Sequence, residues 1–129
     1  MKSNKQIFND ILVSISNYTD ESLYNAIKEL KINDDFRYYY LLAHSIYTLK
    51  KDIRQAEENI SLCIKLLEKQ EVHRIYPNDY MRTEDFMAEF VEPKKSQIYF
   101  LAGEIYAVNG NYAESLKCYQ KSVLDRTSK

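Results

Sequence analysis

The stretch SQIYFLAGEIYAVNGNYAESLKCYQKSVLD, from Ser96 to Asp125, decides the fold that this sequence predicts. Aromatic and small residues recur at helical spacing on both sides of a polar break, Asn109-Gly110-Asn111. The glycine between two asparagines favours a backbone with positive φ and therefore a tight turn. Two helices joined by so short a turn lie antiparallel and bury one face against each other, so the stretch predicts a helical hairpin.

Small residues in this stretch predict a close approach of its two helices. A glycine inside a helix costs about 0.5–1 kcal/mol relative to alanine, so Gly103 is expected to pack against small residues of the second helix. The second helix is expected to bury three larger residues against the first: Leu116, Tyr119 and Val123. Leu124 and Cys118 would then form an exposed apolar strip, which favours self-association of the chain or a continuation by further helix.

The order of residue types in this stretch resembles a tetratricopeptide repeat (TPR), in which Trp, Leu-Gly and Tyr mark the first helix and Ala and Phe the second. The slots of the first helix hold Tyr99, Ala102, Gly103 and Tyr106, with Ala102 in place of the usual leucine. Those of the second helix hold Ser115 and Tyr119, and Thr127 stands near the place of the closing proline. The resemblance implies a helical protein–protein interaction module.

A second, weaker copy of the pattern covers residues 36–69, ahead of the clearer copy in 94–125. Its helices are expected over 36–50 and 53–69, joined by a turn one residue longer than that of the last hairpin. The slots of its second helix hold Ala56, Ile60 and Cys63. Ala56 and Ser115 lie 59 residues apart. Because a repeat is about 34 residues long, an insertion of roughly 25 residues, 70–93, separates the two copies.

The insertion carries its own helix signal. Thr83 is expected to cap a short helix that ends before Pro93. One face of this helix would carry four apolar residues: Phe86, Met87, Phe90 and Val91. We expect such an apolar face to dock on the repeats.

The first 32 residues predict a helical hairpin over 3–32. Ser3 and Gln6 have the spacing of a capping box, and apolar residues then recur at helical spacing up to Asn17. Thr19 is expected to cap the second helix, with Asp20 in its first turn, where the helix dipole favours an acid. This hairpin is either a degenerate first repeat or a plain packing hairpin.

Composition sets the class of protein. The chain has 129 residues, 29% of them charged and 45% apolar, which predicts one globular domain. Only two glycines and two prolines occur, which favours an all-α chain over a turn-rich β protein. The net charge of −1 and the lack of a basic run argue against nucleic acid and anionic membranes as partners. No signal peptide or membrane-spanning run is visible, so a cytoplasmic, intracellular protein is expected.

No residue pattern predicts catalysis, a metal or a cofactor. The two histidines, His44 and His73, lie on different elements and have no cysteine or carboxylate at ligand spacing. Catalytic triad signatures and phosphate-binding glycine loops are absent from the sequence. Cys63 and Cys118 fall within helical patterns, so we expect small buried residues rather than a disulfide.

The resemblance places the functional surface on the concave side, which the first helix of each hairpin lines. It implies eight candidates for partner binding: Arg37, Tyr40, His44, Thr48, Gln97, Phe100, Glu104 and Val108. Chaperone-binding members of the family grip a C-terminal carboxylate with Lys and Asn, but those places hold Tyr40 and His44 here, so that activity is not expected. Tyr40, Phe100 and Val108 suit an apolar helix or an extended peptide. A plain packing role for Tyr40 and Phe100 is the alternative.

The sequence therefore predicts an all-α, TPR-like right-handed stack of three antiparallel helix hairpins, an alpha-alpha superhelix with a long insertion. The expected function is a non-enzymatic scaffold that binds a peptide or helix of a protein partner. Two alternatives stay open. One is a self-association module that forms a homodimer within a large assembly, and the other is a regulatory helical domain cut from a larger enzyme.

Overall fold

The computed structural model describes the backbone of residues 1–73 and 93–127 and the side chains of residues 1–69 and 93–124. This part of the chain contains helices and no strand, so the all-α prediction is confirmed for it. Its elements are α1 (Asn4–Val13), the 3-10 helix η1 (Ile15–Asn17), α2 (Asp20–Ile27), α3 (Phe36–Thr48), α4 (Ile53–His73), α6 (Lys95–Val108) and α7 (Tyr112–Thr127). The short helix expected after Thr83 lies outside the described residues.

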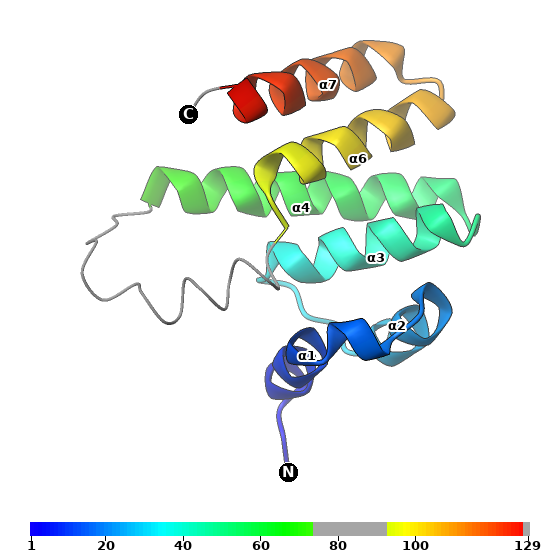
Figure 1. Cartoon of the computed structure of the whole chain (residues 1–129), viewed down its shortest axis with the longest axis vertical. Coiled ribbons are helices and arrows are strands. Elements are labelled where there is room, and N and C mark those ends of the chain that lie inside the picture. The colour runs from blue at the N-terminus through cyan, green and yellow to red at the C-terminus, as the bar shows by residue number, and fades with distance from the viewer. Residues whose placement is uncertain (74–92, 128–129) are drawn as a thin grey trace.

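The helices are stacked in chain order along the long axis of the molecule, from α1 and α2 at one end to α7 at the other (Figure 1). α3 packs on α4, and α6 packs on α7. α4 also contacts α6, and α2 contacts α3, so that neighbouring helices form one continuous stack. A smaller contact joins α3 directly to α6. The first helices of the two C-terminal helix pairs are therefore neighbours.

Two apolar clusters stabilise the stack. The first lies among α3, α4, α6 and α7, and its fully buried members are Ala43, Ala56, Ile60, Cys63, Ile98, Ala102 and Ile105. The second joins α1 and α2 to α3, and its members are Phe8, Ile11, Leu12, Leu23, Ile27, Leu30, Ile32, Tyr38 and Leu42. α3 contributes to both clusters, because residues on two of its sides are buried. It therefore links the N-terminal helices to the rest of the stack.

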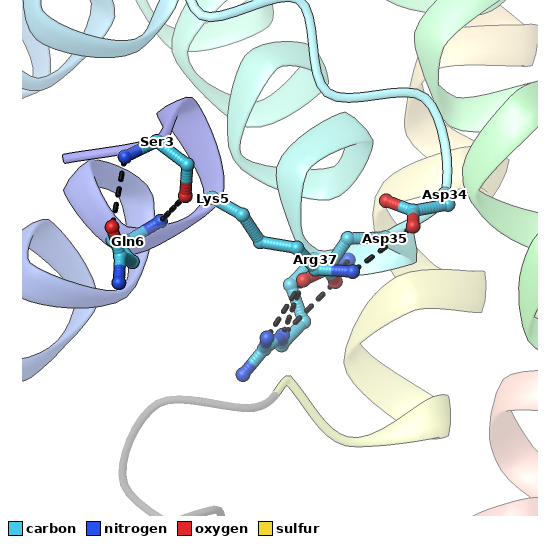
Figure 2. Close-up of polar contacts among 6 residues, drawn as sticks. All are labelled: Ser3, Lys5, Gln6, Asp34, Asp35 and Arg37. Carbon is cyan, nitrogen blue, oxygen red and sulfur yellow. Dashed lines mark hydrogen bonds and ion pairs between the residues drawn. The ribbon is translucent and has the colours of Figure 1, made fainter. Parts of the chain in front are cut away.

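Side-chain caps begin α1 and α2 where the sequence predicts them. The Ser3 hydroxyl accepts from the backbone N–H of Gln6, and the Gln6 side chain accepts from the N–H of Ser3 at 2.8 Å (Figure 2). Thr19 caps α2 in the same reciprocal way with Ser22. Both capping predictions are confirmed, and each cap contributes about 1 kcal/mol to helix stability.

α1 is shorter than predicted. The sequence pattern continues to Asn17, but α1 ends at Val13 and the tighter helix η1 follows. The Ser14 hydroxyl donates to the carbonyl of Asp10 at 2.9 Å. A serine bonded back to the preceding turn in this way bends a helix and competes with its regular ladder. The changed direction still leaves Ile15 packed against the N-terminal cluster.

Tyr38 of α3 fixes the segment that follows α2. Its hydroxyl donates to the carbonyl of Ile27 at 2.9 Å and accepts from the backbone N–H of Lys31 at 3.1 Å. Its ring packs edge-on against Phe8, with centroids 5.5 Å apart. The buried hydroxyl is therefore satisfied while the ring joins α1 to α3.

The turns after α3 and α6 share one hydrogen-bond pattern. Each has two backbone bonds back to its helix: Lys50 to Tyr47 and Lys51 to Ile46 after α3, and Gly110 to Ala107 and Asn111 to Tyr106 after α6. Gly110 has a φ of 83°, as its turn was predicted to require, and Lys50 has a φ of 55° in the equivalent place. The connection after α3 is one residue longer, as predicted. The two helix pairs are thus built in the same way.

Polar side chains hold the α6–α7 turn against the start of α4. Asn109 Nδ2 donates to the carbonyl of Ile53 at 3.2 Å and to Glu57 Oε1 at 3.1 Å. Asn111 Nδ2 donates to the same Glu57 oxygen at 2.7 Å. The two asparagines that mark the turn in the sequence therefore also connect the two helix pairs.

α7 buries small residues rather than the large ones that the pattern predicts. Up to residue 124, where its side chains are described, α7 buries Ser115, Cys118 and Ser122, whereas Leu116 and Val123 are 59% and 49% exposed. The prediction that Leu116 and Val123 pack against the first helix of the hairpin is therefore wrong. The prediction that Cys118 belongs to an exposed strip is also wrong.

Hydrogen bonds from the small residues set the spacing between α6 and α7. Ser115 Oγ donates to the carbonyl of Gly103 at 2.7 Å, and Ser122 Oγ donates to the carbonyl of Ser96 at 2.9 Å. These short side chains bring the two backbones close, and a leucine or valine between them would force the helices apart. A Cβ atom on Gly103 would lie 2.8 Å from the ring of Tyr119. The close neighbour of Gly103 is therefore an aromatic ring as well as a small residue.

Cys63 and Cys118 are both buried free thiols, so the prediction that they act as small core residues is confirmed. Burial raises the pKa of the Cys63 thiol to about 12. Burial also raises the pKa of Cys118, while the nearby charge of Lys121 opposes that rise. At both positions burial therefore disfavours the thiolate, which is the reactive form of cysteine.

Candidate binding groove

α3 and α6 line a groove with side chains that recur once per helical turn. The lining residues are Tyr40, His44, Tyr47 and Thr48 on α3, and Gln97, Phe100, Leu101 and Glu104 on α6. Spacings of three and four residues place them on one face of each helix. The groove has a volume of about 310 Å³. That volume lies at the lower end of the range for ligand sites, and it can take one or two side chains of a peptide.

The structure brings together six of the eight residues predicted from the sequence: Tyr40, His44, Thr48, Gln97, Phe100 and Glu104. Arg37 and Val108 do not line the groove. Val108 lies in the last turn of α6 and is 60% exposed. The sequence analysis missed Tyr47 and Leu101. Their spacing was the available signal, because each lies three or four residues from a predicted lining residue on its own helix.

The Arg37 side chain forms an ion pair with Asp35 at the start of α3. Its Nε donates to both carboxylate oxygens of Asp35, at 3.0 and 3.2 Å, and a terminal guanidinium nitrogen donates at 2.7 Å (Figure 2). Asp35 is buried, and it also caps α3 by accepting from the backbone N–H of Arg37. The guanidinium therefore neutralises a buried capping carboxylate, which gives Arg37 a structural role.

Aromatic rings make up much of the groove wall. Tyr40 and His44 lie in successive turns of α3, with ring centroids 6.0 Å apart. On the α6 side, Phe100 is 46% exposed and packs against Tyr119 of α7, with centroids 5.6 Å apart. Leu101, which also lines the groove, is buried. An exposed aromatic ring beside a buried aliphatic residue favours contact with an apolar or flat group of a partner.

Glu104 supplies the negative charge of the groove. Burial raises the pKa of Tyr47, and the charge of Glu104 raises it further. The same two causes, in the same order, raise the pKa of Tyr119. The Tyr40 pKa is raised chiefly by burial. The carboxylate of Glu104 therefore lies close enough to act on two phenols, one from α3 and one from α7.

α7 lies at the end of the stack (Figure 1), and it carries a second group of exposed apolar residues. We define the α7 outer face by four exposed residues: Tyr112, Leu116, Val123 and Leu124. Val123 and Leu124 also line a shallow hollow with Tyr119 and Gln120. Neither this face nor the hollow includes a charged side chain, whereas Glu104 lines the groove.

The described residues also bear on the presence of a metal site and of a membrane-spanning helix. There, no three His, Cys, Asp or Glu side chains are grouped so that they could hold a metal ion. His44 Nδ1 lies 4.0 Å from Asp20 Oδ1 at the start of α2. None of the described helices has the length and apolar character needed to cross a membrane.

Comparison of the chain with family models, with curated proteins and with solved structures finds no significant match.

Proposed function

We propose that this chain is a non-enzymatic, TPR-like interaction scaffold that binds a peptide or helix of a protein partner in the groove between α3 and α6. The single observation that carries the proposal is the convergence of residues about 60 positions apart in the sequence on one groove. Helical stacks present such grooves where the first helices of successive pairs lie side by side. The repeated turn after α3 and α6 supports a stack of like units.

The residues of the groove suit a side-chain contact better than catalysis. Half-exposed Phe100 and partly buried Tyr40 and Tyr47 offer ring faces, and exposed Gln97 and Thr48 offer hydrogen bonds at its rim. Rigid aromatic residues at the centre and polar residues at the edge are typical of interfaces.

Affinity capture with matched variants tests the proposal. The wild-type chain, Phe100→Ala and Leu116→Ala would be immobilised and exposed to the same cell extract, and bound proteins would be identified by mass spectrometry. Both substitutions remove an exposed apolar side chain, but only Phe100 lines the groove. We expect a partner that binds the wild type and Leu116→Ala and is lost with Phe100→Ala. Partners that bind Phe100→Ala as well as the wild type would contradict the proposal, provided that circular dichroism melts show both variants folded.

The α7 outer face favours a second candidate function, self-association of the chain. Exposed apolar patches of several hundred Å² are common at contact sites of soluble domains. Sedimentation at several concentrations tests this candidate: Leu124→Glu should convert an associating chain to a monomer, and Phe100→Ala should not. A wild-type chain that stays monomeric at high concentration would rule this candidate out and leave the groove as the remaining one.

A further inference from the structure

The Glu104 carboxylate has no counter-charge in the described structure. It lies partly buried in the groove wall, and no hydrogen bond or ion pair links it to another described side chain. The lining residues include no lysine or arginine. The nearest arginine of α3, Arg37, is bound to Asp35. A carboxylate in this position is available to form an ion pair with a cationic group that a partner supplies.

Aromatic rings line the same groove as this carboxylate. Tyr47 and Tyr119 both experience its charge, and Phe100 packs against Tyr119. Tyr40 and Phe100 line the opposite walls of the same groove. Rings attract cations over their faces within about 6 Å of the centroid. A carboxylate among such rings therefore recognises a cation by two effects that act together.

A second carboxylate adds to the negative potential at one side of the groove. Asp20, at the start of α2, lies 4.0 Å from His44 of the groove wall. Asp20 does not line the groove, but it lies next to one residue of the groove wall. The chain as a whole has a net charge of only −1, so this potential belongs to the groove rather than to the whole molecule.

We infer that the groove between α3 and α6 selects a basic side chain of the partner peptide, an inference that rests on the proposed function. The basic group stacks among Tyr40, Tyr47 and Phe100 and pairs with Glu104. Arginine fits best, because its planar guanidinium stacks on rings while its N–H groups bind a carboxylate. Lysine binds more weakly, as a compact charge that holds its water more tightly. The volume of about 310 Å³ accommodates one such extended side chain with its flanking residues.

A peptide series tests the inference by NMR titration of the ¹⁵N-labelled chain. The probes are acetyl-Ala-Leu-Ala-Xaa-Ala-Leu-Ala-amides with arginine, citrulline, lysine, norleucine or glutamate at Xaa. Citrulline keeps the shape of arginine without the charge, and norleucine keeps the aliphatic chain of lysine without the ammonium group. We expect the arginine peptide to shift the amide resonances of Tyr47 and Glu104 and to bind about fivefold more tightly than the citrulline peptide. The glutamate peptide should be the weakest.

Matched variants assign the preference to Glu104. Glu104→Gln should abolish the difference between arginine and citrulline, and Glu58→Gln, which removes an exposed carboxylate of α4 outside the groove, should preserve it. The wild-type preference should also weaken as salt is raised.

The negative outcomes of these titrations distinguish failure of the basic side-chain inference from failure of the proposed binding groove. If citrulline and arginine peptides shift the same groove resonances with equal affinity, the selection of a basic side chain is overturned and the binding groove stands. If no peptide shifts those resonances at millimolar concentration, both the inference and the proposed groove fail. If Glu104→Gln keeps the arginine preference, Glu104 is not the recognising group and the inference is overturned.

Discussion

The N-terminal cluster and α7 use large apolar side chains in opposite ways. In α1 and α2, Phe8, Leu12 and Ile27 are 0%, 2% and 0% exposed. In α7, Leu116 and Leu124 are 59% and 65% exposed, while smaller residues form the buried face. The N-terminal end of the molecule is thus stabilised by burial of large apolar side chains. The other is stabilised by close backbone approach and by hydrogen bonds from serines.

This difference separates residues that stabilise the fold from residues that are available to partners. A buried phenylalanine contributes through its contacts within the chain, so a partner cannot use it. The exposed leucines of α7 bury less apolar area within the chain and present it at the molecular surface, where a partner can contact it. Four substitution or labelling experiments measure how far this contrast holds.

The largest effect is expected in the N-terminal cluster. Phe8→Ala removes a fully buried ring that packs on Tyr38, and should lower the free energy of unfolding by about 3–5 kcal/mol. Urea unfolding followed by circular dichroism measures the change. A loss below about 1 kcal/mol would show that the cluster is loosely packed and that the two ends differ less than the structure indicates.

A smaller loss is expected where α6 and α7 approach most closely. Gly103→Leu should cost about 1–3 kcal/mol, because even a Cβ atom at this position meets the Tyr119 ring at 2.8 Å. Ala113→Leu on the exposed side of α7 is the control and should change stability little. Combining Gly103→Leu with Tyr119→Ala should recover part of the loss. Equal stability of Gly103→Leu and the wild type would contradict the close approach.

The reactivity of the two buried thiols compares local opening in the middle of the stack, at Cys63, with local opening at its edge, at Cys118. Burial raises the pKa of Cys63 to about 12, so its thiolate fraction at pH 8 is roughly 10⁻⁴. Cys118 lies on α7, the last helix of the stack, where local opening exposes a side chain more readily. We expect Cys118 to react with a thiol reagent about tenfold faster than Cys63. The variants Cys63→Ala and Cys118→Ala assign the two phases, and a faster reaction of Cys63 would place the weak point in the middle of the stack.

The smallest effect is expected on the α7 outer face. Leu116→Gln should leave the free energy of unfolding within about 0.5 kcal/mol of the wild type, because the side chain is mostly exposed. The same urea titration measures it at a low protein concentration. A loss above about 1 kcal/mol would mean that Leu116 is covered in solution, by the rest of the chain or by a second copy.

Much of the fold followed from local patterns in the sequence. Ser3 and Thr19 were predicted as caps from their spacing to Gln6 and their place before an apolar run, and the structure confirms both. Gly110 was predicted in a turn with positive φ, and it has a φ of 83°. These features depend on a few neighbouring residues, so periodicity and capping rules suffice to predict them.

The inward face of α7 could not be predicted in the same way. Hydrophobicity alone favours Leu116 and Val123 as buried residues, but the helix turns Ser115 and Ser122 inward to reach carbonyls of α6. Which side of α7 is buried depends on hydrogen-bond acceptors in α6. The spacing of residues within α7 gives no information about those acceptors. The end of α1 was mispredicted for a similar reason, because the Ser14 hydroxyl competes for the backbone of the helix.

The groove residues were predicted less completely than the caps and the turn, but more completely than the buried face of α7. Six of its lining residues were found by periodicity along α3 and α6 together with the repeat resemblance. Arg37 fits the same periodicity, but the nearby Asp35 holds its guanidinium at the start of α3. This short-range ion pair gives Arg37 a contact within the chain that helix periodicity could not predict.

Site-specific photo-crosslinking tests most directly that the groove, and not the α7 outer face, binds the partner. Benzoylphenylalanine would replace Thr48 at the groove rim in one chain and Ala113 on the exposed side of α7 in another, since both positions are exposed. After illumination in cell extract, we predict a discrete crosslinked product from position 48 that disappears when Phe100→Ala is added, and none from position 113. A product from position 113 alone, or one from position 48 that survives Phe100→Ala, would contradict the account.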